Sequence, residues 1–283
     1  MNVEHVNVEP TKIVLIAGKL KIPDRLGHHD YLAGCKLLAA LLEQSAGVQT
    51  ITIPDGWPEQ ERAFDGAQAL VFYTSGRGKQ AFLQSAQRLA RLQKLVDQRV
   101  GIVMIHQAVG VPREFAKQVT SWLGGAHVRG ESQEGHWRSR HREFPAHPTT
   151  RGVLPWSIRD GWLNEIQFVD EMSGVTPLVW SGRKHKGSPT GGTPDVVCWA
   201  YERPAGGRSF CFSGLDAHKA WAELGVRQLL VNGTLWAAGM PVPQSGAPCE
   251  TDARSLKASL TPRGGRRRWT LDFVRRCLRR IVP

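Results

Sequence analysis

Three histidines follow stretches of apolar sequence, at points where a chain can present a reactive side chain. His29 lies in "GHHDY", His106 ends "GIVMIH", and His218 lies in "SGLDAHKAW". A single histidine in a loop is more often a surface or core group. The carboxyl ends of parallel strands, however, meet at one edge of a sheet, and α/β proteins bind ligands there. The sequence therefore predicts one shared site that contains all three histidines.

Two kinds of chemistry are open to such a site. Neutral imidazoles from separate loops can bind a divalent metal such as Zn²⁺ and leave a position open for water or substrate. Alternatively, His106 and His218 are the catalytic pair, one as general base and the other as general acid, because the unperturbed pKa of histidine lies near neutral pH. Asp30 and Asp216 lie next to or near these histidines in the sequence, and their carboxylates could orient the imidazoles. Helix capping is the simpler role for Asp30.

The elements that must position these residues alternate between strands and helices. Apolar runs rich in Val, Ile and aromatic residues predict strands over 12–18, 48–54, 69–75 and 100–106. Helical spacing of apolar residues predicts helices over 30–44 and 80–98. This alternation favours a mostly parallel sheet covered on both faces, which is an α/β fold of the three-layer α/β/α sandwich type.

The second half of the chain is less regular. Residues 124–155 have little periodicity and are rich in His, Arg, Gly and Trp, which predicts a long loop. Further strands are predicted over 165–169, 176–181, 195–202 and 208–214, followed by a helix over 226–239. The predicted organisation is an N-terminal extension over 1–11, one domain over 12–243, and a linker with a basic tail over 244–283.

The charge of the protein is concentrated in that tail. The net charge is +12, and residues 251–283 hold ten basic and two acidic residues, a net +8, which leaves +4 for the rest. The body is therefore not predicted to bind nucleic acid. In the tail, apolar residues at helical spacing form a stripe among arginines: Leu271, Val274, Leu278 and Ile281. Such a helix can bind nucleic acid, an anionic membrane or its own domain.

Cysteine usage and hydropathy favour a cytoplasmic protein. The five cysteines are scattered and form no C-x-x-C pair, which is typical of reduced thiols. No segment approaches 18 consecutive apolar residues, and the start of the chain lacks the pattern of a secretory signal. The oligomeric state stays open, and a homo-oligomer is compatible with the sequence.

Several motifs together resemble the ThuA-like family, named for trehalose utilisation. They are "GHHDYLAGCKLLAALL", "IHQA", "WLGGAHV", "HPTTRGV", "GRSFCFSGLDAH" and "LLVNGTLWAAGMPVP", and they extend from about Lys12 to Pro243. The resemblance implies the flavodoxin-like fold of class I glutamine amidotransferases and a role in the utilisation of trehalose or an oxidised sugar. It also implies a small-molecule sugar as the partner of the site. The candidate substrate-binding residues are His29, Asp30, Tyr31 and Asp216.

The same resemblance separates the protein from glutamine amidotransferases. Those enzymes carry a nucleophilic Cys after the equivalent strand, and a His followed two residues later by Glu. Here His106 takes the place of the Cys, and Ala220 stands two residues after His218. Without a thiolate and its partner, release of ammonia from glutamine is not expected.

A second departure lies in "IRDGWLNEIQF". Many ThuA-like proteins carry an Asp-Glu pair there, whereas this chain has Asp160 followed by Gly161, with Glu165 further on as a weak substitute. Nearby Trp162 is a candidate for stacking on a sugar ring. Two functions remain open: an isomerase, hydrolase or lyase that acts on a sugar, and a non-catalytic sugar-binding or regulatory domain that has kept the fold.

Overall fold

The computed structural model describes residues 9–19, 27–182 and 196–258. A seven-stranded sheet forms the centre, in the order β10-β11-β12-β4-β3-β1-β2. Its strands are β1 Thr11–Ala17, β2 Val48–Ile53, β3 Ala67–Tyr73, β4 Gly101–Ile105, β10 Val175–Trp180, β11 Val196–Glu202 and β12 Arg208–Phe212. The five neighbouring strands β12, β4, β3, β1 and β2 are parallel. Strands β11 and β10 continue the sheet beyond β12 in antiparallel fashion.

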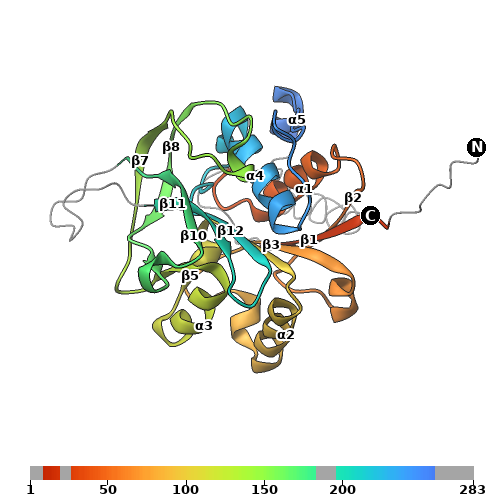
Figure 1. The fold of residues 1–283 in the computed structure, drawn as a ribbon, viewed down its shortest axis with the longest axis vertical. Helices are drawn as coiled ribbons and strands as arrows, with labels where there is room; N and C mark the ends of the chain where they lie inside the picture. Colours follow the sequence, from red (N-terminus) through yellow and green to blue (C-terminus); the bar gives the residue numbers. More distant parts are fainter. Residues whose placement is uncertain (1–8, 20–26, 183–195, 259–283) are drawn as a thin grey trace, which may run out of the picture.

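Helices cover both faces of this sheet. On one face lie α1 Tyr31–Leu42, α4 Leu224–Ala237 and the short α5 Ala253–Ala258, and on the other lie α2 Ala86–Asp97 and α3 Arg113–Leu123 (Figure 1). Strands β3 and β4 are almost entirely buried because they contact side chains from both helical layers. The predicted three-layer α/β/α sandwich with a mostly parallel sheet is confirmed.

The predicted long loop over 124–155 contains regular structure instead. It holds β6 Gly125–Val128, which lies between β5 Gly110–Val111 and β9 Gln167–Phe168, and also β7 Gln133–His141. Strand β7 pairs antiparallel with β8 Trp156–Asn164 along its full length. The prediction was wrong because polar residues occupy both faces of β7, so the strand has no apolar alternation to detect.

Other differences concern helix ends and the predicted linker. The helix expected over 80–98 begins at Ala86, after Ser85 caps it by accepting a hydrogen bond from the Arg88 backbone N–H. Asp30 stands at the N-cap of α1 but makes no capping hydrogen bond with its side chain. The start of the predicted linker packs on α4, because Gln228 donates to the Ala247 carbonyl at 2.6 Å. The basic tail from 259 lies outside the described residues.

No helix in the described part of the chain is both long enough and apolar enough to cross a membrane.

Candidate functional site

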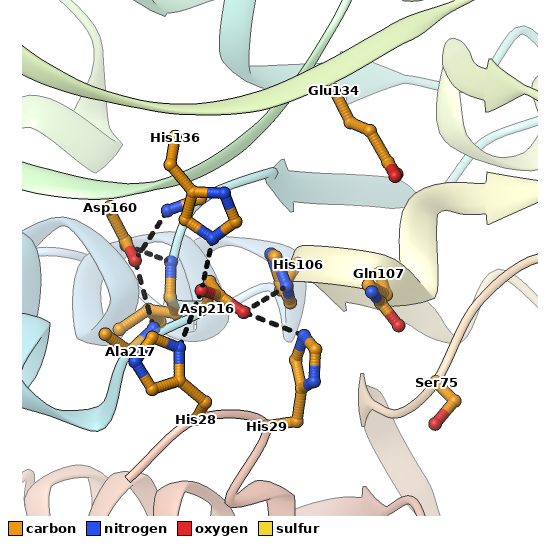
Figure 2. Close-up of polar contacts among 12 residues, drawn as sticks. His28, His29, Ser75, His106, Gln107, Glu134, His136, Asp160, Asp216 and Ala217 are labelled. Carbon is orange, nitrogen blue, oxygen red and sulfur yellow. Dashed lines mark hydrogen bonds and ion pairs between the residues drawn. The ribbon is translucent and has the colours of Figure 1, made fainter. Parts of the chain in front are cut away.

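The candidate site is centred on the carboxylate of Asp216, which lies in the segment after β12. Four histidine side chains point toward this carboxylate (Figure 2). The Nε2 atoms of His29 and His106 lie 2.7 and 3.5 Å from Oδ1. The Nδ1 atom of His28 and the Nε2 atom of His136 each lie 2.9 Å from Oδ2. Both oxygens of one carboxylate are thus shared among four imidazoles.

Backbone pairing between two segments brings His28 and His29 close to Asp216. The segment before α1 lies against the segment after β12, where the His29 N–H donates to the Asp216 carbonyl and the His218 N–H donates to the Gly27 carbonyl. His28 also forms an isolated antiparallel bridge with Ala217. Residues 27–29 and 216–218 therefore lie side by side at the edge where the strands end, as the strand order predicts.

His106 occupies the sharp turn directly after β4. Its φ angle is +54°, an uncommon conformation for a residue with a side chain, and His29 has a φ of +49°. Strained backbone of this kind persists where the surrounding structure holds it, and it is concentrated at functional sites. The turn presents the His106 imidazole to Asp216, as a nucleophile elbow presents its reactive side chain.

One hydrogen bond fixes the tautomer of His106. Its Nδ1 lies 3.0 Å from the Ser213 carbonyl oxygen, and a carbonyl can only accept, so Nδ1 carries the proton. In neutral His106 the Nε2 lone pair therefore faces the Asp216 carboxylate. This Nε2 is buried and has no hydrogen-bond partner among the described residues. Two sets of lone pairs face each other across 3.5 Å, which calls for a proton or a cation between them.

The charge of Asp216 is stabilised by its neighbours. Burial of this carboxylate acts to raise its pKa, but its contacts with His106, His29 and His136 outweigh burial and hold the pKa well below its ordinary value. The residue is only 4% exposed. Asp216 is thus an ionised carboxylate in a largely buried position, which is a strong acceptor for protons or for a cation.

A second carboxylate, Asp160 on β8, holds the segment that carries Asp216. Its Oδ1 accepts from the backbone N–H groups of Gly161 at 2.9 Å and Ala217 at 3.0 Å, and its Oδ2 accepts from that of Leu215 at 2.7 Å. Leu215 has a φ of +71°, so the backbone is strained directly before Asp216. Burial raises the pKa of Asp160. Asp160 is a positioning residue, because its oxygens are used by backbone donors.

Gly161 has no side chain, and the side chains of Asp216 and His136 occupy the space beside it. A Cβ atom at this position would lie 2.7 Å from Cβ of Asp216 and 3.0 Å from Nε2 of His136. His136 stands directly opposite Gly161 in the β7–β8 ladder. The absence of a side chain at Gly161 is therefore what allows His136 to reach Asp216.

The structure brings together only part of the predicted set. His29 and His106 converge as expected, but the third member of the group that could hold a metal is Asp216, not His218; the ligand atoms of the three lie within 4.8 Å of one another. His218 begins a 3₁₀ turn, and its buried imidazole has a pKa lowered by burial, with Asp30 and the Leu256 backbone acting in the opposite direction. It faces the α5 side and not the Asp216 carboxylate.

Two other predicted residues are core groups. Tyr31 is buried under His29, with ring centroids 5.8 Å apart, and burial raises its pKa to about 12. Trp162 is 1% exposed and packs between Trp156 and Phe212, so its ring offers no face to a sugar. Glu165 lies at the turn after β8, where its carbonyl accepts from Ser132, and it has no place in the Asp216 group.

Sequence reasoning missed His28 and His136. His28 is adjacent to the chosen His29, and nothing in "GHHDY" separates the two. His136 lies in the segment interpreted as a loop. The structure buries Ser139 and His141 and exposes Arg138 and Arg140, but all four are polar, so the sequence carries no apolar signal for this strand.

Comparison with known proteins gives a consistent result. A putative ThuA-like protein from Parabacteroides merdae is 15% identical, with a TM-score of 0.56 over 85% of this chain and 98% of that chain. A second, from Bacteroides uniformis, is 12% identical, with a TM-score of 0.53 over 84% and 95%. These similarities show the fold. None of the curated proteins compared with this sequence matches it.

The family model ThuA, described as trehalose utilisation, matches residues 19–237. This range includes all of the residues that surround Asp216, and it supports a role related to carbohydrate utilisation. The chain belongs to the ThuA family.

Proposed function

We propose that this protein is an enzyme that acts on a sugar, with the Asp216 carboxylate and its histidines as the reactive centre. We further propose that His29, His106 and Asp216 hold a divalent cation such as Zn²⁺. Membership of the ThuA family supports the carbohydrate part of this proposal. The chemical part depends on the geometry of the described side chains.

The observation that carries the proposal is the orientation of His106. With Nδ1 donating to Ser213, neutral His106 directs an Nε2 lone pair at the buried Asp216 carboxylate, 3.5 Å away. Metal-bound histidines in proteins are oriented in this way, with the second ring nitrogen donating to a carbonyl or carboxylate. A 2-His-1-carboxylate set is an ordinary set of protein ligands for a catalytic divalent metal.

Distances within the group fit a metal of this size. Two ligand atoms on one tetrahedral zinc ion lie about 3.3 Å apart, given bonds of about 2.0–2.2 Å. The separation of His106 Nε2 and Asp216 Oδ1 is 3.5 Å, close to that value. The corresponding separation for His29 is 2.7 Å and must lengthen, which is possible because the His29 side chain is 43% exposed.

Each residue then has a definite task. A bound divalent cation supplies Lewis acidity, which polarises a carbonyl or hydroxyl oxygen of the sugar. Asp216 and His106 would hold the cation from buried positions, and His29 would complete the ligand set from a side chain that is 43% exposed. His28 and His136 stay on Oδ2, where each is in hydrogen-bond contact with the carboxylate and is positioned to pass a proton to a bound sugar.

Metal-free acid–base chemistry is a second candidate, favoured by the short hydrogen bonds to Asp216. An ionised carboxylate that accepts from several imidazoles stabilises an imidazolium, which can act as a general acid. In either case we propose that the protein is not a glutamine amidotransferase. His106 replaces the elbow cysteine, and the four described cysteines, Cys35, Cys198, Cys211 and Cys249, are all buried.

The experiment combines metal titration with a sugar assay. Zn²⁺ is titrated by calorimetry into chelator-treated wild type, His29→Ala, His106→Ala and the matched control His136→Gln, which keeps a donor for Oδ2. The same proteins are incubated with trehalose and a panel of neutral and oxidised sugars, and conversion is followed by NMR. We expect one Zn²⁺ per wild-type chain and per control chain. Loss of a ligand should weaken binding by more than the about 10–100-fold that removal of an outer partner costs.

Each result decides one part of the proposal. Zinc binding that depends on His29 and His106, together with sugar conversion, supports it in full. Sugar conversion that depends on His106 but needs no metal contradicts the proposed cation site and supports metal-free acid–base chemistry. Sugar binding without conversion, whatever the metal content, overturns the enzyme and supports a binding domain.

A further inference from the structure

A pocket of about 210 Å³ opens on the His28 and His136 side of Asp216. Figure 2 shows Ser75 and Gln107 on the opposite, His29 and His106, side of the carboxylate. The pocket is lined by His28, His136, Arg159, Asp160, Asp216, Ala217 and Lys219. Pockets that enclose a whole ligand usually measure about 300–1,000 Å³, so this one fits one end of a sugar.

The two cations that line this pocket form no ion pair with its two carboxylates. Its two carboxylates are already used, since Asp160 accepts three backbone N–H groups and Asp216 accepts from imidazoles on both oxygens. Arg159 and Lys219 are exposed, and neither makes an ion pair within the described part of the chain. Within the part of the chain that the structure describes, the pocket therefore presents two cations that are not paired with an acidic side chain.

The strand beside the pocket adds positive charge where a sheet normally avoids it. Arg138 on β7 stands directly opposite Arg159 on β8, and like charges in opposed positions destabilise a sheet. His136, Arg138 and Arg140 share the outward face of β7, because residues two apart on a strand point the same way. An unfavourable arrangement of this kind is useful if an anion binds between the cations.

We propose that this pocket is an anion subsite, in which Arg159 and Lys219 bind a carboxylate or phosphate group of the sugar. The inference rests on the proposed function for the neighbouring reactive centre and narrows its substrate to anionic sugars. A guanidinium binds either group through two parallel N–H···O bonds, and an ammonium adds a point charge. The anion anchors one end of the sugar, and the rest of the ring extends over Asp216 toward His29.

The test measures binding and requires no turnover. Glucuronate, glucose 6-phosphate, inorganic phosphate and uncharged glucose are titrated into wild type, Arg159→Gln, Lys219→Gln and a control, Lys94→Gln. The control removes one exposed cation from α2, in the other helical layer. We expect the charged ligands to bind more tightly than glucose, and each pocket variant to weaken them by about 10-fold, the value of one charge-assisted contact. The control should bind as wild type does.

The sugar acid and the sugar phosphate distinguish the two sources of the anion, and the one that binds more tightly identifies the group. Equal affinity for glucose and both charged sugars would overturn the subsite, as would equal losses in Arg159→Gln and Lys94→Gln. The same titrations in chelator-treated His106→Ala separate this inference from the proposed function. Anion binding should survive there even if zinc binding and conversion are absent.

Discussion

Replacement of Asp160 by Asn tests whether a buried carboxylate holds the reactive segment in place. The change keeps the size of the side chain and removes its charge. Asp160 accepts three backbone N–H groups, from Gly161, Leu215 and Ala217. An amide has one acceptor oxygen, so in Asp160→Asn at least one of these donors must face the side-chain NH₂ group, where no hydrogen bond can form.

The cost follows from the hydrogen bonds. A bond to a charged group contributes about 1.5–3 kcal/mol, and a neutral one about 0.5–1.5 kcal/mol. The variant loses one hydrogen bond to a charged group and weakens the other two. It also no longer buries a charge, which recovers part of the cost. That burial is the cause of the raised pKa of Asp160. We expect a net loss of about 2–4 kcal/mol. This is a large part of the about 5–15 kcal/mol typical of a domain, yet the variant should still fold.

The local consequence is larger than the global one. Leu215 is held at a φ of +71°, and such strain costs about 1–3 kcal/mol when it is not compensated. Without the Asp160 acceptor, this residue relaxes and moves Asp216 away from its histidines. Zinc affinity should therefore fall in Asp160→Asn although no ligand has been changed.

Urea denaturation and zinc calorimetry measure the two effects, with Asp97→Asn as the matched control. Asp97 is an exposed carboxylate at the end of α2. Surface substitutions of this type usually change stability by no more than about 0.5 kcal/mol. If Asp160→Asn behaves like the control in both measurements, Asp160 does not position the site, and its role as a positioning residue is refuted.

Three further predictions concern the packing beside Asp216, the pH dependence of stability and the C-terminal segment. Gly161→Ala should cost about 1–3 kcal/mol and weaken zinc binding, because its Cβ meets Asp216 at 2.7 Å; an unchanged melting temperature and affinity would contradict this. Burial lowers the pKa of His141 to about 4, below the unfolded value of about 6.5, so stability is complete above that value and is lost as pH falls toward 4. His141→Phe should remove about 2 kcal/mol of the stability difference between pH 7 and pH 5 in urea titrations; an unchanged difference would exclude His141 as its source. Arg227 donates to the carbonyls of Trp221, Ala222 and Cys249, so Arg227→Met should cost about 2–4 kcal/mol and expose residues near Cys249 to limited proteolysis, and full resistance would argue against this anchor.

The sequence predicts the sheet well because its strands are strongly apolar. Strands β3 and β4 are buried on both faces, and apolar runs of that kind are hard to mistake. The ends of β1 and β4 then place His29 and His106 at one edge without any knowledge of side-chain packing. Two of the three predicted metal ligands depend only on this topology, and they converge.

The incorrect predictions concern residues whose side-chain direction depends on local backbone conformation. His218 is two residues from Asp216, but a 3₁₀ turn begins at His218 and carries its side chain toward α5. Hydrophobic periodicity contains no information on such a turn. The hairpin that delivers His136 was missed for a related reason, since its inward positions include Ser139 and His141 rather than aliphatic residues.

The residues around Asp216 are drawn from distant parts of the chain, and the pair of His28 and Asp216 spans 188 positions. Contacts of such long range form late, because the intervening chain must first lose its freedom. The cluster therefore exists only in the completely folded domain. A ligand that binds it stabilises the entire molecule, by about 2.7 kcal/mol at 100 times its dissociation constant. Melting temperature alone can then rank candidate sugars and metals before any reaction is known.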